Sequence, residues 1–497
     1  MAIALAIYGA VLMATNPWFT AVDDEVVITD VAAKPFLKTI QVFLGGTGQH
    51  EHPPLSDLVL HGWLWLTAGN LRWLRLPSVI FYLLGAWFLV QAARRIAGDR
   101  AGYSTLALLL LWPYGFHFAR IAGWYSFTFM LVSVLTFFYL RYVEDPTLKR
   151  WLPIAFCALA LVYTNYFAWA VLGCIGLDLI SRFWRDKTKW IVFLSTAVLL
   201  VLANVPILAA FLREVRRGAH PAPLSASSAA TGIYNLYCLF VSESVAPWFW
   251  VLGVAAGLAI ACALLCTLIY TVSDARRFFI YFFLLLGAMT FVQIGNTKRS
   301  LMISPWLLLP VGVAVASATL PSARRALAAA LLLIGAIGWY GIFARSLYAA
   351  PHWIEPWQKV ARQAAQTAGT NGVIIANNPG FFFYLTYLLP ATNPVEQGHF
   401  SGYLPVTVRT PGVYFPQQWI DAGRPMARTV MLVNGLSFEV PGATIEDLGP
   451  VLDAHCKKID EQRLVHDSGA KWKREFQPVT GQRVWRIQVT TYTCPAP

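Results

Sequence analysis

The stretch Trp248–Thr271, WFWVLGVAAGLAIACALLCTLIYT, decides the class of fold, because it contains no charged residue over 24 positions. A helix of about 20 apolar residues is long enough to cross the hydrocarbon core of a bilayer. The rest of the chain has the same character: of its 497 residues, 57% are hydrophobic and 13% are charged. A soluble domain carries about 25% charged residues. The composition therefore predicts an α-helical polytopic membrane protein.

Hydropathy predicts about eleven membrane spans along the chain. In chain order the candidates are Ala2–Thr20, Pro77–Val90, Tyr103–Phe118, Trp124–Leu140, Trp151–Tyr163, Tyr166–Ile180, Ile191–Leu212, Trp248–Thr271, Phe278–Gln293, Leu301–Thr319 and Ala326–Phe343. The first span has no basic residue before it and no small-residue cleavage site after it, so it is predicted to be a retained helix.

The charges of the loops indicate how the eleven predicted spans are oriented in the membrane. With eleven spans, one set of alternate loops holds most of the excess basic residues: Arg94, Arg95, Arg100, Arg141, Lys149, Arg150, Arg182, Arg185, Lys187, Lys189, Arg276, Arg277, Arg324 and Arg325. The positive-inside rule makes that side cytoplasmic. The N-terminus is then cytoplasmic, and the loop 20–76, the loop 213–247 and the tail after Phe343 are external. The net charge of +13 is explained by orientation, and nucleic acid is not an expected partner.

The tail has the pattern of a soluble domain. Trp357–Ala365 has helical spacing, and Gly372–Asn377 and Arg428–Val433 have the pattern of short buried strands. We therefore predict a transmembrane domain over 1–345 and an extracytoplasmic α/β domain over 346–497. The cysteines of this second domain are Cys456 and Cys494, which form either a disulfide or two separate thiols.

An acidic cluster, Asp23-Asp24-Glu25, follows the first span. Such a cluster is either a solvated helix boundary or a functional site. The loop after it stays apolar, which brings the acids toward the membrane surface. Partial desolvation raises the pKa of a carboxyl group and suits it to act as a general base.

The same loop contains His50-Glu51-His52-Pro53-Pro54-Leu55. The two prolines favour an extended backbone before them, in which His50 and His52 share one face and Glu51 points away. The imidazoles are suited to bind a divalent metal, with an acid from Asp24 completing the site. Hydrogen bonding to a phosphate or to a catalytic acid is the other interpretation.

Two short external hairpins carry basic residues. Arg120 either extends toward lipid headgroups or binds a phosphate with its planar guanidinium group. Lys298-Arg299 opposes the charge bias of the loops, which indicates an anionic ligand headgroup. Asp178, inside an apolar span, is interpreted as boundary solvation or an ion pair with Arg182 at i+4.

Together these motifs resemble the C-type integral-membrane glycosyltransferases, in the protein-mannosyltransferase-like and aminoarabinose-transferase-like group. The resemblance covers nearly all of 1–345 and weakly the tail. It rests on the acids after the first span, His-Pro-Pro-Leu at 52–55, the segment Leu71–Ser78, the helix start at Trp124, Lys298-Arg299-Ser300-Leu301 and Trp357.

The resemblance implies a polyprenyl-phosphate sugar donor, inversion at the anomeric carbon, and a multi-pass protein of the bacterial inner membrane with its active site outside the cytoplasm. Its acceptor would be a lipid, a polysaccharide or a protein. It assigns Asp24 as the general base, with Glu25 supporting it. His52, Arg120, Lys298 and Arg299 would bind the donor phosphate. Glu51 and His50 would bind a divalent metal.

A transporter or flippase of a lipid-linked glycan intermediate is the alternative function. Transporters place their polar sites near the bilayer midplane and are often built from inverted repeats. This sequence shows no internal repeat, and its polar motifs gather at one membrane face. The enzyme is therefore the favoured prediction.

Overall fold

The computed structural model describes residues 1–19, 23–45, 53–67, 73–218, 226–292, 297–349, 354, 356–368, 372–377, 381, 384–385, 397–400, 404–407, 412–435, 444–466 and 486–495. The chain divides into two compact units. The helical unit contains Met1–Asn16 and most of the chain from Ala32 to Tyr348. The sheet unit contains Ala349–Pro497 together with Pro17–Val31.

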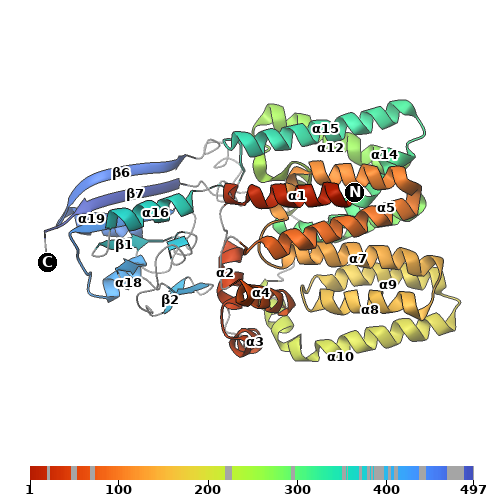
Figure 1. Ribbon diagram of the computed structural model, residues 1–497, viewed down its shortest axis with the longest axis horizontal. Helices are drawn as coiled ribbons and strands as arrows, with labels where there is room; N and C mark the ends of the chain where they lie inside the picture. Colours follow the sequence, from red (N-terminus) through yellow and green to blue (C-terminus); the bar gives the residue numbers. More distant parts are fainter. Residues whose placement is uncertain are drawn as a thin grey trace. The chain divides into compact units, whose positions relative to one another are not determined.

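The described part of the helical unit consists mainly of α-helices (Figure 1). Its α-helices are α1 (Ala2–Ala14), α3 (Phe36–Gly45), α4 (Leu55–Leu66), α5 (Leu76–Leu111), α6 (Pro113–Phe118), α7 (Trp124–Glu144), α8 (Leu148–Val162), α9 (Ala168–Phe183), α10 (Lys187–Gly218), α11 (Ala226–Val241), α12 (Trp250–Tyr270), α13 (Ser273–Phe291), α14 (Pro305–Ser317) and α15 (Pro321–Ala344). Three short 3₁₀ turns are η1 (Asn16–Trp18), η2 (Ser242–Ser244) and η3 (Lys298–Met302).

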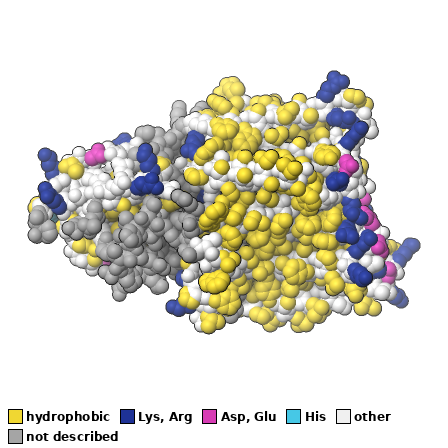
Figure 2. Space-filling view, viewed as in Figure 1, with side chains coloured by type: hydrophobic (Ala, Val, Ile, Leu, Met, Phe, Trp, Pro, Cys, Tyr) yellow, Lys and Arg dark blue, Asp and Glu magenta, His cyan; other side chains and the backbone are white. Residues whose placement is uncertain are grey.

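The predicted membrane character is confirmed. Among the described residues, five helices are long and apolar enough to cross a bilayer, namely α5, α7, α10, α12 and α15, and α1 and α14 are shorter apolar helices. Only 6% of the apolar window of α10 is buried, so its side chains suit a lipid environment. Hydrophobic side chains cover the flank of the helical unit in Figure 2, and Lys and Arg side chains gather at one end.

Each predicted span overlaps a helix of this unit, and α5 overlaps two. α5 is interrupted at Ala97 and Gly98, where Gly98 has φ 77°. A glycine adopts this left-handed conformation without a Cβ clash. The Tyr82 hydroxyl donates to the Leu109 carbonyl at 3.2 Å. Since 27 residues of straight helix would measure about 40 Å, the two halves of α5 must fold back against each other.

One predicted span is wrong in detail, and two predicted loops contain helices. The predicted span Tyr103–Phe118 is broken at Pro113, which begins α6, because proline has no N–H for a continuing helix. The loop 213–247 contains α11, which packs against α13, α15 and α6. The described part of the loop 20–76 contains the short helices α2 (Asp23–Ala32), α3 and α4.

One buried acid joins three helices. Asp178 is 3% exposed and forms the predicted i,i+4 ion pair with Arg182 at 2.8 Å. It also forms an ion pair with Arg277 and accepts hydrogen bonds from the hydroxyls of Tyr281 and Tyr139. These donors come from α7, α9 and α13. The carboxylate therefore replaces its lost hydration with four protein donors.

The sheet unit is built on a five-stranded sheet of order β4-β1-β5-β7-β6. The strands are β1 (Val373–Ala376), β4 (Val413–Tyr414), β5 (Thr429–Gly435), β6 (Lys457–His466) and β7 (Arg486–Thr493). β4, β1 and β5 are parallel, whereas β5, β7 and β6 are antiparallel. A separate antiparallel pair joins β2 (Gln397–Phe400) to β3 (Leu404–Thr407).

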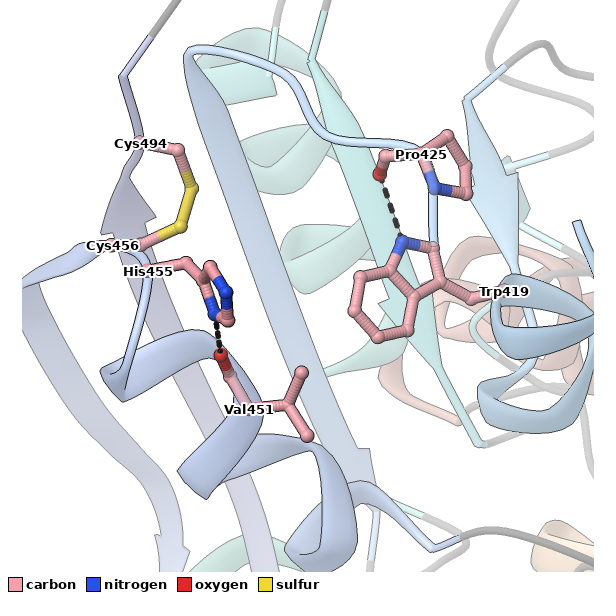
Figure 3. Close-up of a disulfide and its surroundings, with 6 residues drawn as sticks. All are labelled: Trp419, Pro425, Val451, His455, Cys456 and Cys494. Carbon is pink, nitrogen blue, oxygen red and sulfur yellow. Dashed lines mark hydrogen bonds between the residues drawn. A yellow bond between two sulfur atoms is a disulfide. The ribbon is translucent and has the colours of Figure 1, made fainter. Parts of the chain in front are cut away.

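The helices of this unit are α2, α16 (Trp357–Ala368), α18 (Pro416–Asp421) and α19 (Ile445–Asp453). α16 buries Trp357, Val360, Ala361 and Ala364, which recur at helical spacing. The core of the unit includes Trp419, whose indole N–H donates to the Pro425 carbonyl at 2.9 Å (Figure 3). The predicted helix and both predicted strands of the tail are present, so the prediction of a C-terminal α/β domain is confirmed.

Cys456 and Cys494 form a disulfide with their Cα atoms 4.3 Å apart (Figure 3). Strand register brings them together: Lys457 of β6 lies opposite Thr493 of β7, so the cysteines just outside these positions also lie opposite each other. The disulfide joins the beginning of β6 to the end of β7.

Candidate active site

The predicted catalytic acids begin a helix. Asp23, Asp24 and Glu25 form the first turn of α2, where the helix dipole stabilises negatively charged groups. Glu25 is fully buried, as is Thr29 one turn later. The Asp24 side chain lies outside the described part of the structure. The structure thus places the backbone of the acids on α2, and their catalytic roles stay predictions.

The predicted histidine motif lies outside the described residues. His50, Glu51 and His52 precede the point where the structure resumes at Pro53. Within the described ranges, no group of three His, Cys, Asp or Glu side chains could hold a metal ion. The proposed metal ligands Glu51 and His50 are therefore untested.

An acid that the sequence analysis passed over follows this motif. Asp57, in the first turn of α4, is 2% exposed, and the Ser56 hydroxyl donates to its carboxylate at 3.4 Å. The N–H of Leu55 donates to the Tyr163 carbonyl at 3.0 Å, which fixes the beginning of α4 to the end of α8. The sequence signal for Asp57 was its position two residues after Leu55, the last residue of the histidine motif.

The predicted phosphate-binding pair lies on η3. Lys298 and Arg299 are both half-buried and are followed by the buried residues Ser300, Leu301 and Met302. The Lys298 ammonium lies 6.0 Å from the centre of the Tyr125 ring, at the beginning of α7. A cation at this distance from an aromatic face is attracted by the ring. The pair provides positive charge between α13 and α14, next to an aromatic surface.

Beside η3 lies a buried group of five residues that we call the η2–η3 polar cluster: Tyr114, His117, Ser242, Glu243 and Thr297. The Thr297 hydroxyl donates to the Glu243 carboxylate, and the Tyr114 hydroxyl donates to the Thr297 carbonyl. His117 Nδ1 and the Ser242 hydroxyl are hydrogen-bonded at 2.8 Å. The cluster thus connects α6, η2 and the beginning of η3.

Tyr348, which follows α15, packs edge-on against the His117 ring with their centres 5.9 Å apart. Burial is the main cause of the raised pKa of the Tyr348 phenol, and the coulombic effects of Arg345 and Arg120 oppose the rise. The phenol is therefore neutral at physiological pH and contributes no negative charge to the cluster.

Arg120 lies in a different environment from the one predicted. Its side chain is 1% exposed, so it does not extend to lipid headgroups, and its role in binding the donor phosphate stays a prediction. Its guanidinium group donates to the carbonyls of Phe116 and Leu12 and to the Thr15 hydroxyl. These bonds join the end of α1 to α6. Buried arginines keep their charge, so its positive field acts at this end of the unit.

Sequence reasoning missed the polar cluster for two reasons. Tyr114 and His117 fell inside a predicted span and were counted as part of its apolar run, although polar side chains inside a span are a signal of function. Glu243 fell inside a segment interpreted as an external loop, where an acidic residue is expected to be solvated and does not indicate a site. The signal was the isolated Ser242-Glu243-Ser244 within an apolar run.

Comparisons with known proteins agree with this architecture. The sequence model of a family described as dolichyl-phosphate-mannose-protein mannosyltransferase matches residues 51–210. No curated protein sequence matches the chain.

Two solved structures of ArnT from Cupriavidus metallidurans are similar over nearly the whole chain. The apo structure has 15% sequence identity and a TM-score of 0.51, and the match covers 98% of this chain and 97% of ArnT. The structure bound to undecaprenyl phosphate has 14% identity and a TM-score of 0.52, covering 99% and 96%. The predicted resemblance is thereby confirmed at the level of fold: a helical membrane unit followed by a C-terminal α/β unit.

Proposed function

We propose that this chain is a membrane glycosyltransferase that moves a sugar from a polyprenyl-phosphate donor to an acceptor hydroxyl outside the cytoplasm. The observation that carries the proposal is the fold match to ArnT over nearly the full length of both chains, with undecaprenyl phosphate bound in one of the ArnT structures. The mannosyltransferase family match to residues 51–210 supports the same chemistry independently.

The basic residues of η3 suit the donor side of this reaction. When the bond between the anomeric carbon and the phosphate oxygen breaks, negative charge develops on the polyprenyl phosphate. Lys298 and Arg299 would neutralise that charge, and their partial burial strengthens the interaction. His52 would provide a further donor to the phosphate, and the field of Arg120 would add to the positive potential.

The acids of α2 suit the acceptor side. Asp24 would accept the proton of the acceptor hydroxyl, while the oxygen of that hydroxyl attacks the anomeric carbon from the face opposite the phosphate. One displacement of this kind inverts the configuration. Glu25 would support Asp24, and a divalent metal at His50 and Glu51 would assist in orienting the donor. The reaction would occur at the periplasmic face of a bacterial inner membrane.

The test uses the purified chain in liposomes that contain a polyprenyl-phosphate sugar with a radiolabelled sugar. Asp24→Asn should lower the rate of transfer by a factor of about 10²–10⁴ while binding of undecaprenyl phosphate is retained. The donor itself is identified by mass spectrometry of the lipid-linked sugars that accumulate in a deletion strain. Transfer at the normal rate by Asp24→Asn would remove Asp24 as the base. Movement of the labelled lipid between leaflets without transfer would instead establish a flippase.

A further inference from the structure

The turn η2 enters the η2–η3 polar cluster with an unusual backbone. Ser242 has φ 66°, in the left-handed region that residues with a Cβ rarely adopt. Ser242, Glu243 and Ser244 are all buried. A strained residue in a buried turn persists only where its surroundings fix it, and such residues gather at functional sites.

Contacts from two helices hold η2. The Ser244 hydroxyl hydrogen-bonds at 2.8 Å to the carbonyls of Val241 and of Gly338 in α15. A Cβ atom at Gly341 would lie 2.4 Å from the Ser244 carbonyl oxygen, so only glycine allows α15 to approach this closely. On the other side, His117 of α6 bonds to the Ser242 hydroxyl.

Glu243 is the residue of η2 whose side chain contacts η3. Its carboxylate accepts the hydroxyl hydrogen bond of Thr297, the N-cap residue of η3. The Thr297 carbonyl accepts from the Tyr114 hydroxyl and from the N–H of Ser300. Thr297 is thus held through both its side chain and its backbone. The two residues that follow it are Lys298 and Arg299.

We propose that Glu243 and Thr297 are positioning residues, whose side-chain hydrogen bond sets the place of Lys298 and Arg299 for the donor phosphate. This inference rests on the proposed function, because it assigns a role to the same basic pair. A hydrogen bond to a carboxylate is stronger than one between neutral groups. The Glu243 carboxylate, on the fixed turn η2, is therefore a suitable anchor for η3, which is a short 3₁₀ turn with few backbone hydrogen bonds of its own.

Two matched substitutions at Thr297 test the inference in the full-length protein in liposomes. Thr297→Val keeps the shape of the side chain but removes the hydroxyl, whereas Thr297→Ser keeps the hydroxyl. Thr297→Val should raise the Kd for undecaprenyl phosphate and the donor KM about tenfold, the effect of losing a charge-assisted hydrogen bond. The acceptor KM should not change. Thr297→Ser should bind undecaprenyl phosphate like the unmodified protein.

A double-mutant cycle shows whether the effect passes through η3. In the background Lys298→Ala/Arg299→Ala, Thr297→Val should weaken phosphate binding no further, because the groups it positions are gone. A full additional loss in that background would overturn the inference, as would equal increases in donor and acceptor KM. If Thr297→Val does not fold, Glu243→Gln and Glu243→Ala replace it, with the larger donor effect expected for Ala.

Failure of the inference and failure of the proposed function give different results. If Lys298→Ala/Arg299→Ala binds undecaprenyl phosphate normally, the proposed phosphate role of η3 is wrong, and the inference is overturned with it. If that double variant loses binding while Thr297→Val retains it, the positioning role alone is wrong and the proposed function stands.

Discussion

Replacing Cys456 by Ser should destabilise the sheet unit by about 3.9 kcal/mol. The magnitude follows from the loop that the disulfide closes, since Cys456 and Cys494 are 38 residues apart. In the chain-entropy relation, a loop of this length removes about 13 cal/mol/K from the unfolded state, which is about 3.9 kcal/mol at 25 °C. That value corresponds to a change of about 600-fold in the opening equilibrium of the unit.

Hydrogen–deuterium exchange of the full-length protein in nanodiscs measures this equilibrium. The amides of β5 and β7, in the middle of the sheet, exchange only when the unit opens, so their exchange should accelerate by up to the same factor. Cys262→Ser is the control, because Cys262 is a free thiol in α12. It should leave the exchange of β5 and β7 unchanged. Unaltered exchange in Cys456→Ser would show that strand pairing alone stabilises the unit and would refute the loop argument.

The same disulfide tests the proposed orientation. Disulfides persist in oxidising compartments and are rare in the cytosol. In intact cells, Cys456 and Cys494 should therefore resist alkylation until the protein is reduced. Rapid alkylation of both thiols before reduction would place the sheet unit in the cytoplasm, where an extracytoplasmic transfer reaction would have no access to it.

Three further predictions follow from individual acids. Asp24→Asn should lower kcat by a factor of about 10²–10⁴ with little change in Kd for undecaprenyl phosphate, measured by transfer and binding assays in liposomes; an unchanged kcat would contradict the general-base role. Asp178→Ala should destabilise the helical unit by about 1–3 kcal/mol, measured by thermal unfolding in detergent, because the buried Tyr139 hydroxyl loses its acceptor while Arg182 keeps its ion pair with Asp274; a gain in stability would contradict this. The backbone N–H of Thr444, at the N-cap of α19, is the main cause of the lowered pKa of Asp447. The stabilisation from this bond is therefore complete above the ordinary pKa of an aspartate and is lost as the pH falls through the lowered pKa. The protection of the α19 amides, relative to their intrinsic exchange at the same pH, should therefore fall in that acidic range, and Asp447→Asn should remove this change in protection.

The parts of the fold that could be predicted are those that depend on local composition. The spans over α7 and α12 were found because an apolar helix in a bilayer needs an uninterrupted apolar sequence. The strands β1 and β5 were found because buried parallel strands are short apolar runs between turn residues. α11 was not among the predicted spans: its 16 residues are fewer than the roughly 20 that a span needs, and its packing against α6, α13 and α15 is not a property of the local sequence.

The same distinction applies to the site. Lys298 and Arg299 were found because their charge opposes the loop bias, which is a property of the sequence alone. The partners of Thr297 were not found, because Glu243 and Tyr114 are 54 and 183 residues away along the chain. Only the packing of α6, η2 and η3 brings these groups together.

Asp178 and Glu243, two of the buried acids of the helical unit, have different partners and therefore different expected roles. Asp178 accepts a hydrogen bond from Tyr139 of α7, and Lys298, which follows the Glu243 partner Thr297, lies near Tyr125 of the same helix. Tyr125 and Tyr139 are about 21 Å apart along the helix axis. Asp178 receives donors from three long helices, so its removal should loosen the packing of the unit. Glu243 instead binds the residue that precedes two half-buried cations, so its removal should displace those cations while the long helices keep their contacts. The two acids are therefore separable by experiment: variants of Asp178 should change the unfolding temperature, and variants of Glu243 should change the affinity for the donor phosphate.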